Sequence, residues 1–271
     1  MADMTDSPLT RDGKSIVLAH DHGLEHGPTA FSAVPDRLNP ENVFEMATHD
    51  AVTAFAVQKG LAKQYYPSYE DSVNLLAKCN GSSSLRSGEP FSPQTWSVDH
   101  AAELGADAIG YTVYPGTNTE HEMFEDFYQV QEAAEDHDLP VAMWSYPRGQ
   151  PIKEHRHPDT IAYATRIGLE LGADFVKVKY PRSGAAMAHA VDAAGPCNVL
   201  LSGGSKSDDL TFLSMVETAI DAGASGLAVG RNVWQHEDPM SLLDALEKVV
   251  FEEQTAADAL GREAIEHSST A

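Results

Sequence analysis

The stretch Asp174–Tyr180, with the sequence DFVKVKY, decides the fold, because it predicts a short strand that carries a lysine into an apolar interior. Side chains alternate along a strand, so Phe175, Lys177 and Lys179 share one face and the two valines share the other. A strand that is apolar on both faces is typical of a buried parallel sheet. Lysine is uncommon in such a strand, so Lys177 needs an explanation.

Two readings of Lys177 are open at this point. Burial lowers the pKa of an amine, and a second cation on the same face, here Lys179, is expected to lower it further. A lysine that is neutral near pH 7 can attack a carbonyl group and form a Schiff base. The alternative is structural: the stem of Lys177 packs in the interior while its charged head reaches water.

Length and composition indicate one domain in a reducing compartment. A chain of 271 residues with 42% hydrophobic content is ordinary for a single α/β barrel. Its two cysteines, Cys79 and Cys197, lack a paired-motif spacing and are interpreted as reduced structural thiols. The first twelve residues have no signal-peptide pattern, and no apolar run reaches membrane-spanning length. We therefore expect a cytoplasmic protein.

The charge balance limits the partners. The formal net charge is -23, from 41 acidic and 18 basic side chains. Such a negative field disfavours nucleic acid and anionic membranes. It suits a solvated surface in a high-salt cytoplasm, where ions screen the self-repulsion. The alternative is an ordinary acidic cytosolic protein.

Strand-like apolar runs alternate with amphipathic helical ones along the chain. Strands are predicted at 15–20, 51–57, 73–78, 108–113, 140–145, 174–180, 198–201 and 226–229. Helices are predicted at 40–50, 97–104, 120–135, 158–171, 184–194, 208–222 and 239–251. This order predicts an α/β fold, a single (β/α)8 TIM barrel. An open doubly wound sheet is the alternative, but no Gly-x-Gly-x-x-Gly motif follows the first strand.

The barrel domain is expected over residues 1–252, followed by a weakly helical or disordered tail over 253–271. The connection at 23–39 is long and contains glycine and proline, so we expect it to be an active-site loop. In such barrels the site lies at the carboxyl ends of the strands. Eight of the 18 basic residues follow predicted strands: Lys59, Lys78, Arg148, Lys177, Lys179, Arg182, Lys206 and Arg231. Unless this enrichment is chance, it indicates an anionic substrate.

Two glycine-containing turns indicate a phosphate site. Ser202-Gly203-Gly204 follows the seventh strand, and Gly230-Arg231 follows the eighth. Barrels often bind phosphate at these two positions through backbone N–H groups. Glycine lets the backbone approach an anion closely. Either turn alone is weak evidence, whereas both together, with an arginine, favour phosphate binding.

Tyr146 and Asp21 are candidates for proton transfer. Tyr146 ends the strand beside Lys177, and Trp144 and Arg148 share its face. A tyrosine near cations can have a lowered pKa and act as proton donor and acceptor. The alternative is that Tyr146 only packs.

Three histidines raise the alternative of a zinc enzyme. His20, His22 and His26 lie close together in the sequence, but no clear further ligand occurs elsewhere. We interpret His22 and His26 as hydrogen-bond donors to substrate oxygens. The sequence therefore predicts no cofactor and no metal.

An ordered set of motifs resembles the archaeal-type class I fructose-1,6-bisphosphate aldolases. The motifs are DHGLEHGP at 21–28, QKG at 58–60, IGYTVYPG at 109–116, WSYPRG at 144–149, VKVKY at 176–180, SGG at 202–204 and VGRNVWQ at 229–235. The resemblance runs from about residue 15 to residue 239. It implies a (β/α)8 barrel that acts without metal in glycolysis and gluconeogenesis. It also implies a homo-oligomer, typically a decamer built from pentamers.

The resemblance also implies roles for single residues. Lys177 would form the Schiff base, Tyr146 would donate and accept protons, and Asp21 would assist as an acid or base. Residues implied to bind substrate are His22, His26, Trp144, Arg148, Lys179, Ser202, Gly203, Gly204, Gly230 and Arg231. Of these, the two late turns would hold the 1-phosphate, and His26 and Arg148 would face the 6-phosphate. One departure is Pro181-Arg182-Ser183-Gly184, where the family commonly has a Thr-Gly-Asp-type turn.

Two alternatives to this aldolase stay open. A sister family, 2-amino-3,7-dideoxy-D-threo-hept-6-ulosonate synthase, shares the lysine chemistry. It also has the Asp-His-Gly of 21–23, the Tyr-Pro-Arg-Gly of 146–149 and the Gly-Arg-Asn of 230–232. The Trp144-Ser145 pair and residues 111–114 resemble the aldolase more. The second alternative is a non-catalytic barrel that binds a phosphorylated sugar. Such a binder would not need the buried nucleophile Lys177.

Overall fold

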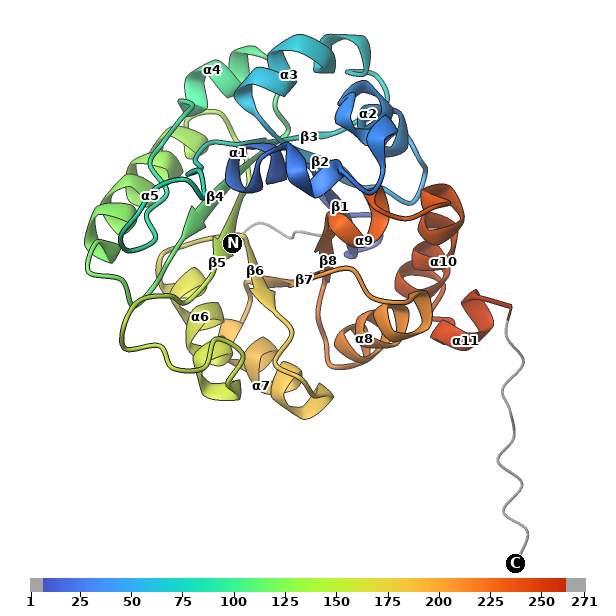
Figure 1. The fold of residues 1–271 in the computed structure, drawn as a ribbon. Coiled ribbons are helices and arrows are strands. Elements are labelled where there is room, and N and C mark those ends of the chain that lie inside the picture. Colours follow the sequence, from blue (N-terminus) through green and yellow to red (C-terminus); the bar gives the residue numbers. More distant parts are fainter. Residues whose placement is uncertain (1–6, 262–271) are drawn as a thin grey trace, which may run out of the picture.

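Eight parallel strands close into one barrel in sequence order, within residues 7–261, which the computed structural model describes (Figure 1). The strands are β1 (Ser15–Ala19), β2 (Ala54–Gln58), β3 (Leu75–Lys78), β4 (Ala108–Val113), β5 (Val141–Ser145), β6 (Phe175–Lys179), β7 (Asn198–Ser202) and β8 (Gly226–Val229). The prediction of a single (β/α)8 TIM barrel is confirmed. The part of the predicted tail at 262–271 lies outside the described residues.

Helices surround the barrel (Figure 1). The longer ones are α2 (Glu41–Ala47), α4 (Val98–Glu103), α5 (Glu120–Glu135), α6 (Pro158–Glu170), α7 (Gly184–Ala194), α8 (Asp209–Asp221) and α10 (Pro239–Phe251). Each was predicted, and three of them match their predicted bounds. Side-chain oxygens of Ser97, Ser183 and Asp208 accept backbone N–H bonds at the starts of α4, α7 and α8. Such caps fix where a helix begins.

Several short helices were not predicted. Two of them, α3 (Lys59–Tyr65) and α9 (Arg231–Trp234), follow strands directly, and η4 (Tyr66–Ser68) continues α3. The expected loop at 23–39 instead contains α1 (His22–His26), η2 (Pro28–Phe31) and η3 (Pro35–Leu38). A last short helix, α11 (Ala256–Ala259), lies in the tail predicted to be weakly helical or disordered, and Ala256 and Ala259 are buried. Segments this short show little of a hydrophobic period, and α3 and α9 also have no side-chain cap that would mark where they begin.

Alternation along the strands separates two apolar clusters. Val176 and Val178 of β6 pack outward against the helices, whereas Phe175 faces the barrel interior. The interior cluster is rich in small residues, and its members are Leu9, Val17, Ala19, Ala54, Ala56, Leu76, Ala108, Ala142, Trp144, Phe175, Leu200 and Ala228. Because so many of these are alanine, the interior does not fill at the carboxyl ends of the strands. This leaves room for a cavity there.

The barrel closes where β8 meets β1, and the contact is unusually tight. Gly226 pairs with Ser15 and has a φ of +147°. A Cβ atom on Gly226 would collide with the backbone of Ser15. Only glycine fits both the φ angle and the close approach. Near this seam, Ser15 Oγ donates to the carbonyl oxygen of Leu9 at 2.7 Å, which holds the buried Leu9 in the interior cluster.

No helix within residues 7–261 is long and apolar enough to cross a membrane.

Candidate active site

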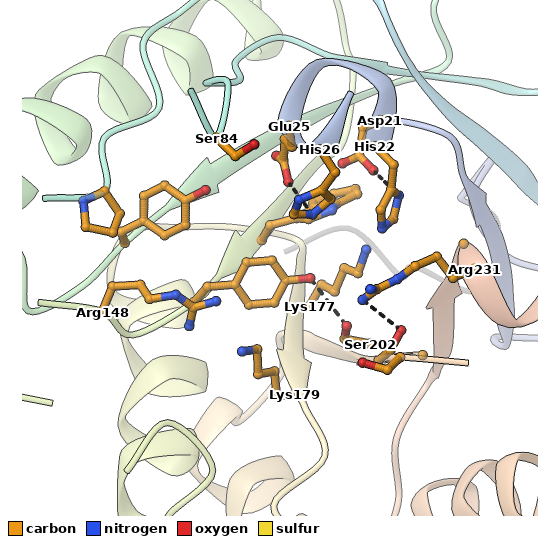
Figure 2. A pocket seen from close by; sticks show the side chains of 18 of the residues that line it. Asp21, His22, Glu25, His26, Ser84, Arg148, Lys177, Lys179, Ser202 and Arg231 are labelled. Carbon is orange, nitrogen blue, oxygen red and sulfur yellow. Dashed lines mark hydrogen bonds and ion pairs between the residues drawn. The ribbon is translucent and has the colours of Figure 1, made fainter. Parts of the chain in front are cut away.

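A cavity of about 780 Å³ opens at the carboxyl ends of the strands. It gathers the candidate residues named from the sequence, which come from the carboxyl ends of β5, β6 and β7 and from the segments after β1, β5, β7 and β8 (Figure 2). Those that line it are Asp21, His22, His26, Trp144, Tyr146, Arg148, Lys177, Lys179, Ser202, Gly203, Gly204, Gly230 and Arg231. The fold therefore brings all thirteen into one cavity.

Lys177 lies at the floor of this cavity with 4% of its surface exposed. Its register partner on β5 is Trp144, and the Lys177 Nζ atom sits 4.6 Å from the centre of the indole ring. Burial lowers the pKa of Lys177 to about 8, while the nearby carboxylates of Asp21 and Glu25 oppose that shift. Within residues 7–261 its amine makes no hydrogen bond to another protein group. Lys177 therefore offers an amine that loses its proton near neutral pH and faces the cavity.

The cation that helps lower the pKa of Lys177 is Lys78, not Lys179 as the sequence suggested. Lys78 ends β3 on the interior side of the barrel and is fully buried. Its amine lies 5.9 Å from the Trp144 ring centre, so the two amines share one indole. Lys179 faces the other way along the cavity, where burial and then Arg148 lower its pKa to about 8. The cation that acts on Lys177 is therefore set by proximity across the barrel, and not by a shared face of one strand.

The pKa values of two carboxyl groups beside Lys177 are shifted in opposite directions. Burial alone would raise the pKa of Asp21, but contact with His22, whose Nδ1 lies 3.5 Å from Asp21 Oδ1, and the charge of Lys177 hold that pKa below its ordinary value. Burial and the charge of Asp21 raise the pKa of Glu25. Opposed shifts of this kind mark the members of an acid–base pair. Glu25 was not predicted as a site residue, although the motif at 21–28 contains it.

The expected lowering of the Tyr146 pKa is wrong. Burial raises the pKa of Tyr146 well above its ordinary value, and the charge of Asp21 raises it further. The Tyr146 hydroxyl donates to Ser202 Oγ at 3.5 Å, which opposes the shift only in part. The guanidinium carbon of Arg148 lies 5.9 Å from the centre of the Tyr146 ring. Tyr146 is therefore a neutral phenol at pH 7, suited to donate a proton.

The two glycine turns form one end of the cavity. Asn232, at the start of α9, donates from Nδ2 to the carbonyl oxygen of Gly203 at 2.7 Å and accepts from the Ser207 N–H at 3.0 Å. Arg231 Nη2 donates to the carbonyl oxygen of Gly204 at 3.1 Å. The buried Asn232 thus ties the segment after β7 to the segment after β8. Its side chain amide, which sequence analysis passed over, gives this end of the cavity its shape.

Another part of the cavity wall contains His26, Arg148 and a segment that was not predicted. Residues of the connection after β3 line it, among them Ser84 and Arg86. The Ser84 N–H donates to the carbonyl oxygen of Glu25 at 3.0 Å, so this connection is attached to α1. A low-complexity stretch of serines carries no motif, and its position is set by this contact in space.

Three members of the predicted basic patch do not line the cavity. Lys59 begins α3, which turns it away from the strand ends. Lys78 is buried beneath the cavity, where its amine donates to Asn80. Arg182 lies at the rim and is paired with Glu154 at 2.6 Å. Conversely, Arg86 and Arg156 do line the cavity, so its basic character is retained with different residues.

The histidines near β1 are placed differently from zinc ligands. His20 is buried among the rings of Phe31, Phe55 and Trp234, and burial lowers its pKa to about 4. In residues 7–261 no group of three or more His, Cys, Asp or Glu side chains has a metal-binding arrangement. His22 and His26 face the cavity, 5.3 Å apart between ring centres.

A closed barrel with a buried amine on an anion-binding cavity defines the Schiff-base class of aldolases. Comparisons with known proteins agree. Residues 15–236 match the DeoC/LacD family aldolases. Over 262 residues the chain is 63% identical to a class 1 fructose-bisphosphate aldolase of Halobacterium salinarum, covering 97% of this chain and 100% of that protein. It is 43% identical to the class 1 enzyme of Thermoproteus tenax, covering 96% and 99%.

A solved structure gives the same result. An archaeal fructose-1,6-bisphosphate aldolase with its catalytic lysine covalently bound to a carbinolamine intermediate superposes with a TM-score of 0.86. The two chains are 44% identical, and the match covers 89% of this chain and 96% of that one. The chain therefore belongs to the archaeal-type class I fructose-bisphosphate aldolases, a family of Schiff-base-forming lyases. The family resemblance inferred from the sequence motifs is confirmed.

Proposed function

We propose that this protein reversibly cleaves fructose 1,6-bisphosphate to dihydroxyacetone phosphate and glyceraldehyde 3-phosphate through a Schiff base on Lys177. The observation that carries this proposal is a buried amine with a lowered pKa, without a hydrogen-bond partner in the described part of the chain, at the floor of a cavity with cations at both ends. A sugar with a phosphate at each end matches such a cavity in charge.

The covalent steps need only the lysine and protons. The Lys177 amine adds to the C2 carbonyl of the ketose, and loss of water gives an iminium ion. The C3–C4 bond then breaks: its electron pair moves toward the iminium to form an enamine, and the C4 hydroxyl proton passes to a base, releasing the aldehyde. Protonation of the enamine at C3 and addition of water release the ketone and restore the free amine.

We assign the proton transfers to Tyr146 and Asp21. The raised pKa of Tyr146 keeps its hydroxyl protonated, which suits it to protonate the aldehyde oxygen in the synthetic direction. Cleavage runs this transfer in reverse, so the C4 hydroxyl proton passes to Tyr146 when that residue is ionised. Asp21, whose pKa is held low, stays ionised beside Lys177 and assists by accepting protons during formation and loss of the carbinolamine. The surroundings of the two groups thus favour different protonation states of donor and acceptor.

The two phosphates are assigned to the two ends of the cavity. The 1-phosphate binds at Ser202, Gly203, Gly204, Gly230 and Arg231, close to Lys177 and Lys179. The 6-phosphate binds near His26 and Arg148. Lowering of the His26 pKa by burial, His22 and Arg231 keeps that ring neutral, so it donates one hydrogen bond rather than a charge. His22 contacts Asp21, and Trp144 narrows the cavity beneath the sugar chain.

The test uses two substrates that differ only at the distal phosphate. A lost contact to a charged group costs about 1.5–3 kcal/mol, so Arg148→Ala should lower kcat/KM for fructose 1,6-bisphosphate about 10–100-fold. The loss for fructose 1-phosphate should be far smaller. Arg166→Ala, an exposed arginine on α6 paired with Glu170, is the matched control. Equal losses for both substrates would show that Arg148 does not read the 6-phosphate.

The sister synthase is the second candidate. Its sugar ends in a methyl group, which gains nothing from the cationic side chains of Arg86 and Arg148 at the distal end. An assay of the wild-type protein with fructose 1,6-bisphosphate, beside an aspartate semialdehyde transaldol assay, decides between them. Activity only in the second assay would assign the protein to the synthase.

We also propose a cytoplasmic homo-oligomer, a decamer by family resemblance. An apolar hollow of about 320 Å³ between α5 and α6, next to the exposed ring of Tyr163, offers a contact surface for another copy. Light scattering after size exclusion, at high salt, measures the oligomer directly. A monomer under those conditions would contradict the proposal.

A further inference from the structure

Arg156 lies at the phosphate end of the cavity, although no motif contains it. Its Nη2 atom is 3.9 Å from the position that a Cβ atom would occupy on Gly204. The Gly204 carbonyl oxygen also accepts a hydrogen bond from Arg231 Nη2. Gly204 has a φ of +71°, a conformation that favours glycine, so no Cβ atom blocks the approach of an anion to its backbone. A phosphate placed on this turn would meet Arg231 and Arg156 together.

We propose that Arg156 is a further 1-phosphate-binding residue, and that an ion pair between Arg182 and Glu154 positions the segment that carries it. This inference rests on the proposed function, because it concerns the same substrate. It adds a side chain from the β5–α6 connection to a site built otherwise from the ends of β7 and β8.

The charges at this end of the cavity support an anion. Lys179 is half-buried, and its pKa is lowered by burial, by Arg148, which we assign to the 6-phosphate, and then by Arg156 and Arg231. The carboxylates that line the cavity belong to other parts of it: Asp21 and Glu25 lie on the β1 side, and Glu89 accepts a bond from the Asn118 N–H. The Arg231 Nε atom is buried and lacks a hydrogen-bond partner. A phosphate dianion would offset this concentration of positive charge.

The connection that carries Arg156, residues 146–157, is fixed by contacts on both sides of this residue. His155 Nδ1 lies 3.0 Å from the carbonyl oxygen of Pro147, which folds the segment back on its own start. Glu154 accepts a bond from Arg182 Nη1 at 2.6 Å, and this joins the segment to the β6–α7 connection. The following residue, His157, caps α6. Arg156 is thus held between two anchored neighbours.

Arg182 adopts a conformation that favours glycine. Its φ is +74°, in the left-handed region, which is strained for a residue other than glycine. The position falls in the turn where this chain departs from the common Thr-Gly-Asp type. A long side chain there reaches Glu154, which glycine could not do. Because the pair is 64% and 46% exposed, its own attraction is weak, and its role is to orient the segment rather than to stabilise the barrel.

The experiment measures phosphate-end affinity without turnover. Calorimetry at constant ionic strength gives the dissociation constants of inorganic phosphate and dihydroxyacetone phosphate for wild type and for Arg156→Ala, Arg156→Lys, Arg182→Gly and the double variant Arg156→Ala/Arg182→Gly. The matched control is Arg166→Ala, which removes an equally exposed Arg–Glu pair from α6, outside the cavity. Kinetics with fructose 1,6-bisphosphate and fructose 1-phosphate accompany it.

Arg156→Ala should weaken phosphate binding about 10-fold, the scale of one charge-assisted contact, and Arg156→Lys should restore part of it. The kcat/KM values for fructose 1,6-bisphosphate and fructose 1-phosphate should fall by the same factor, unlike those of Arg148→Ala. Arg182→Gly, which also relieves the backbone strain, should weaken binding about 2–3-fold, and should have no effect once Arg156 is alanine, because coupled residues are not additive.

An Arg156→Ala protein that binds phosphate like the Arg166→Ala control would overturn the phosphate role. An effect of Arg182→Gly that persists in the Arg156→Ala background would overturn the positioning role. If wild type bound phosphate as expected and the variants followed the predicted order while fructose 1,6-bisphosphate was never cleaved, the proposed function would fail and this inference would stand.

Discussion

Lys78 and Lys177 are two buried lysines of one barrel, and they differ in the surroundings of their amines. Each lies on the interior side of a strand, with exposed fractions of 0% and 4%, and each has its amine near the ring of Trp144. The Lys78 amine donates to the carbonyl oxygen and to Oδ1 of Asn80, both at 2.7 Å. In the described residues the Lys177 amine has no such acceptor, and it faces the cavity.

The difference teaches what burial alone does not provide. Burial lowers the pKa of both amines. Two close acceptors favour the protonated form of Lys78, and an ammonium group has no lone pair, so this residue acts as a fixed structural group. A nucleophile needs a lone pair and an open approach, and Lys177 has both. The active-site lysine is therefore distinguished by what its amine does not bind.

The largest effect is expected from removing the reactive amine. Lys177→Ala should lose the covalent route, and turnover should fall by about 10⁴-fold or more, the scale at which a lost nucleophile acts. Borohydride with dihydroxyacetone phosphate should attach a mass label to wild type at Lys177 and to no other lysine. A label on Lys78 would contradict its assignment as a structural group. Loss of wild-type activity with a chelator would contradict catalysis by the Lys177 amine without metal.

The next effect concerns the neutral phenol beside Lys177. Tyr146→Phe should leave Schiff-base trapping measurable and cut turnover by about 10²–10⁴-fold, the usual contribution of a proton donor. Single-turnover trapping and steady-state kinetics separate the two steps. Turnover within about threefold of wild type would move the proton transfer to another group, with Asp21 next in line.

Replacing the structural lysine should have a smaller effect, with a definite sign. Lys78→Met leaves the Asn80 acceptors unsatisfied, at a cost of about 1–3 kcal/mol in the free energy of unfolding. It also removes a cation that lowers the Lys177 pKa, so that pKa rises from about 8. Lys177 reacts as the neutral amine, and its neutral fraction grows with pH. The acid limb of kcat/KM should therefore shift to higher pH.

Denaturant unfolding and a pH–rate profile check the two parts of this prediction. Met is the conservative choice, because it keeps the stem length and the packing of Lys78 against the interior. An acid limb that stays in place, with stability lost as expected, would show that Lys78 supports the barrel without acting on the amine of Lys177.

The smallest effect should come from salt, and it separates exposed charges from buried ones. Between 0.01 M and 1 M salt the Debye length falls from about 30 Å to about 3 Å. With a net charge of -23, the melting temperature should rise over this range as surface repulsion is screened. The acid limb set by Lys177 should move little, because its neighbours lie inside the barrel. A flat melting temperature would contradict the high-salt interpretation of the surface.

The barrel could be predicted from the sequence because its signals are local. Eight apolar runs, each followed by a helical period or a turn, indicate the order of the strands, and capping residues such as Ser97 and Ser183 mark helix starts. The short helices α3 and α9 could not be predicted in this way. Four to seven residues span at most two turns, and the contacts that keep them helical come from the rest of the barrel.

Part of the candidate site could also be predicted from local signals, and part could not. Lys177, Tyr146 and the two glycine turns follow from strand ends, where the fold dictates the position. The direction of the Tyr146 pKa and the identity of the cation beside Lys177 depend on distances across the barrel, which strand alternation does not contain. Arg156 and Ser84 come from connections whose course is set by contacts such as Arg182–Glu154. Sequence periodicity carries no information about such connections.

The Trp144 indole, which lies near both amines, provides an intrinsic fluorescence probe of the reaction. Forming the iminium places a permanent positive charge on a nitrogen now 4.6 Å from the ring centre, and hydrolysis removes it again. The indole N–H is buried and has no hydrogen-bond partner, so little else competes to change its surroundings. The other two tryptophans, Trp96 and Trp234, can be replaced by phenylalanine. The fluorescence emission of Trp144 would then report the formation and hydrolysis of the iminium in real time.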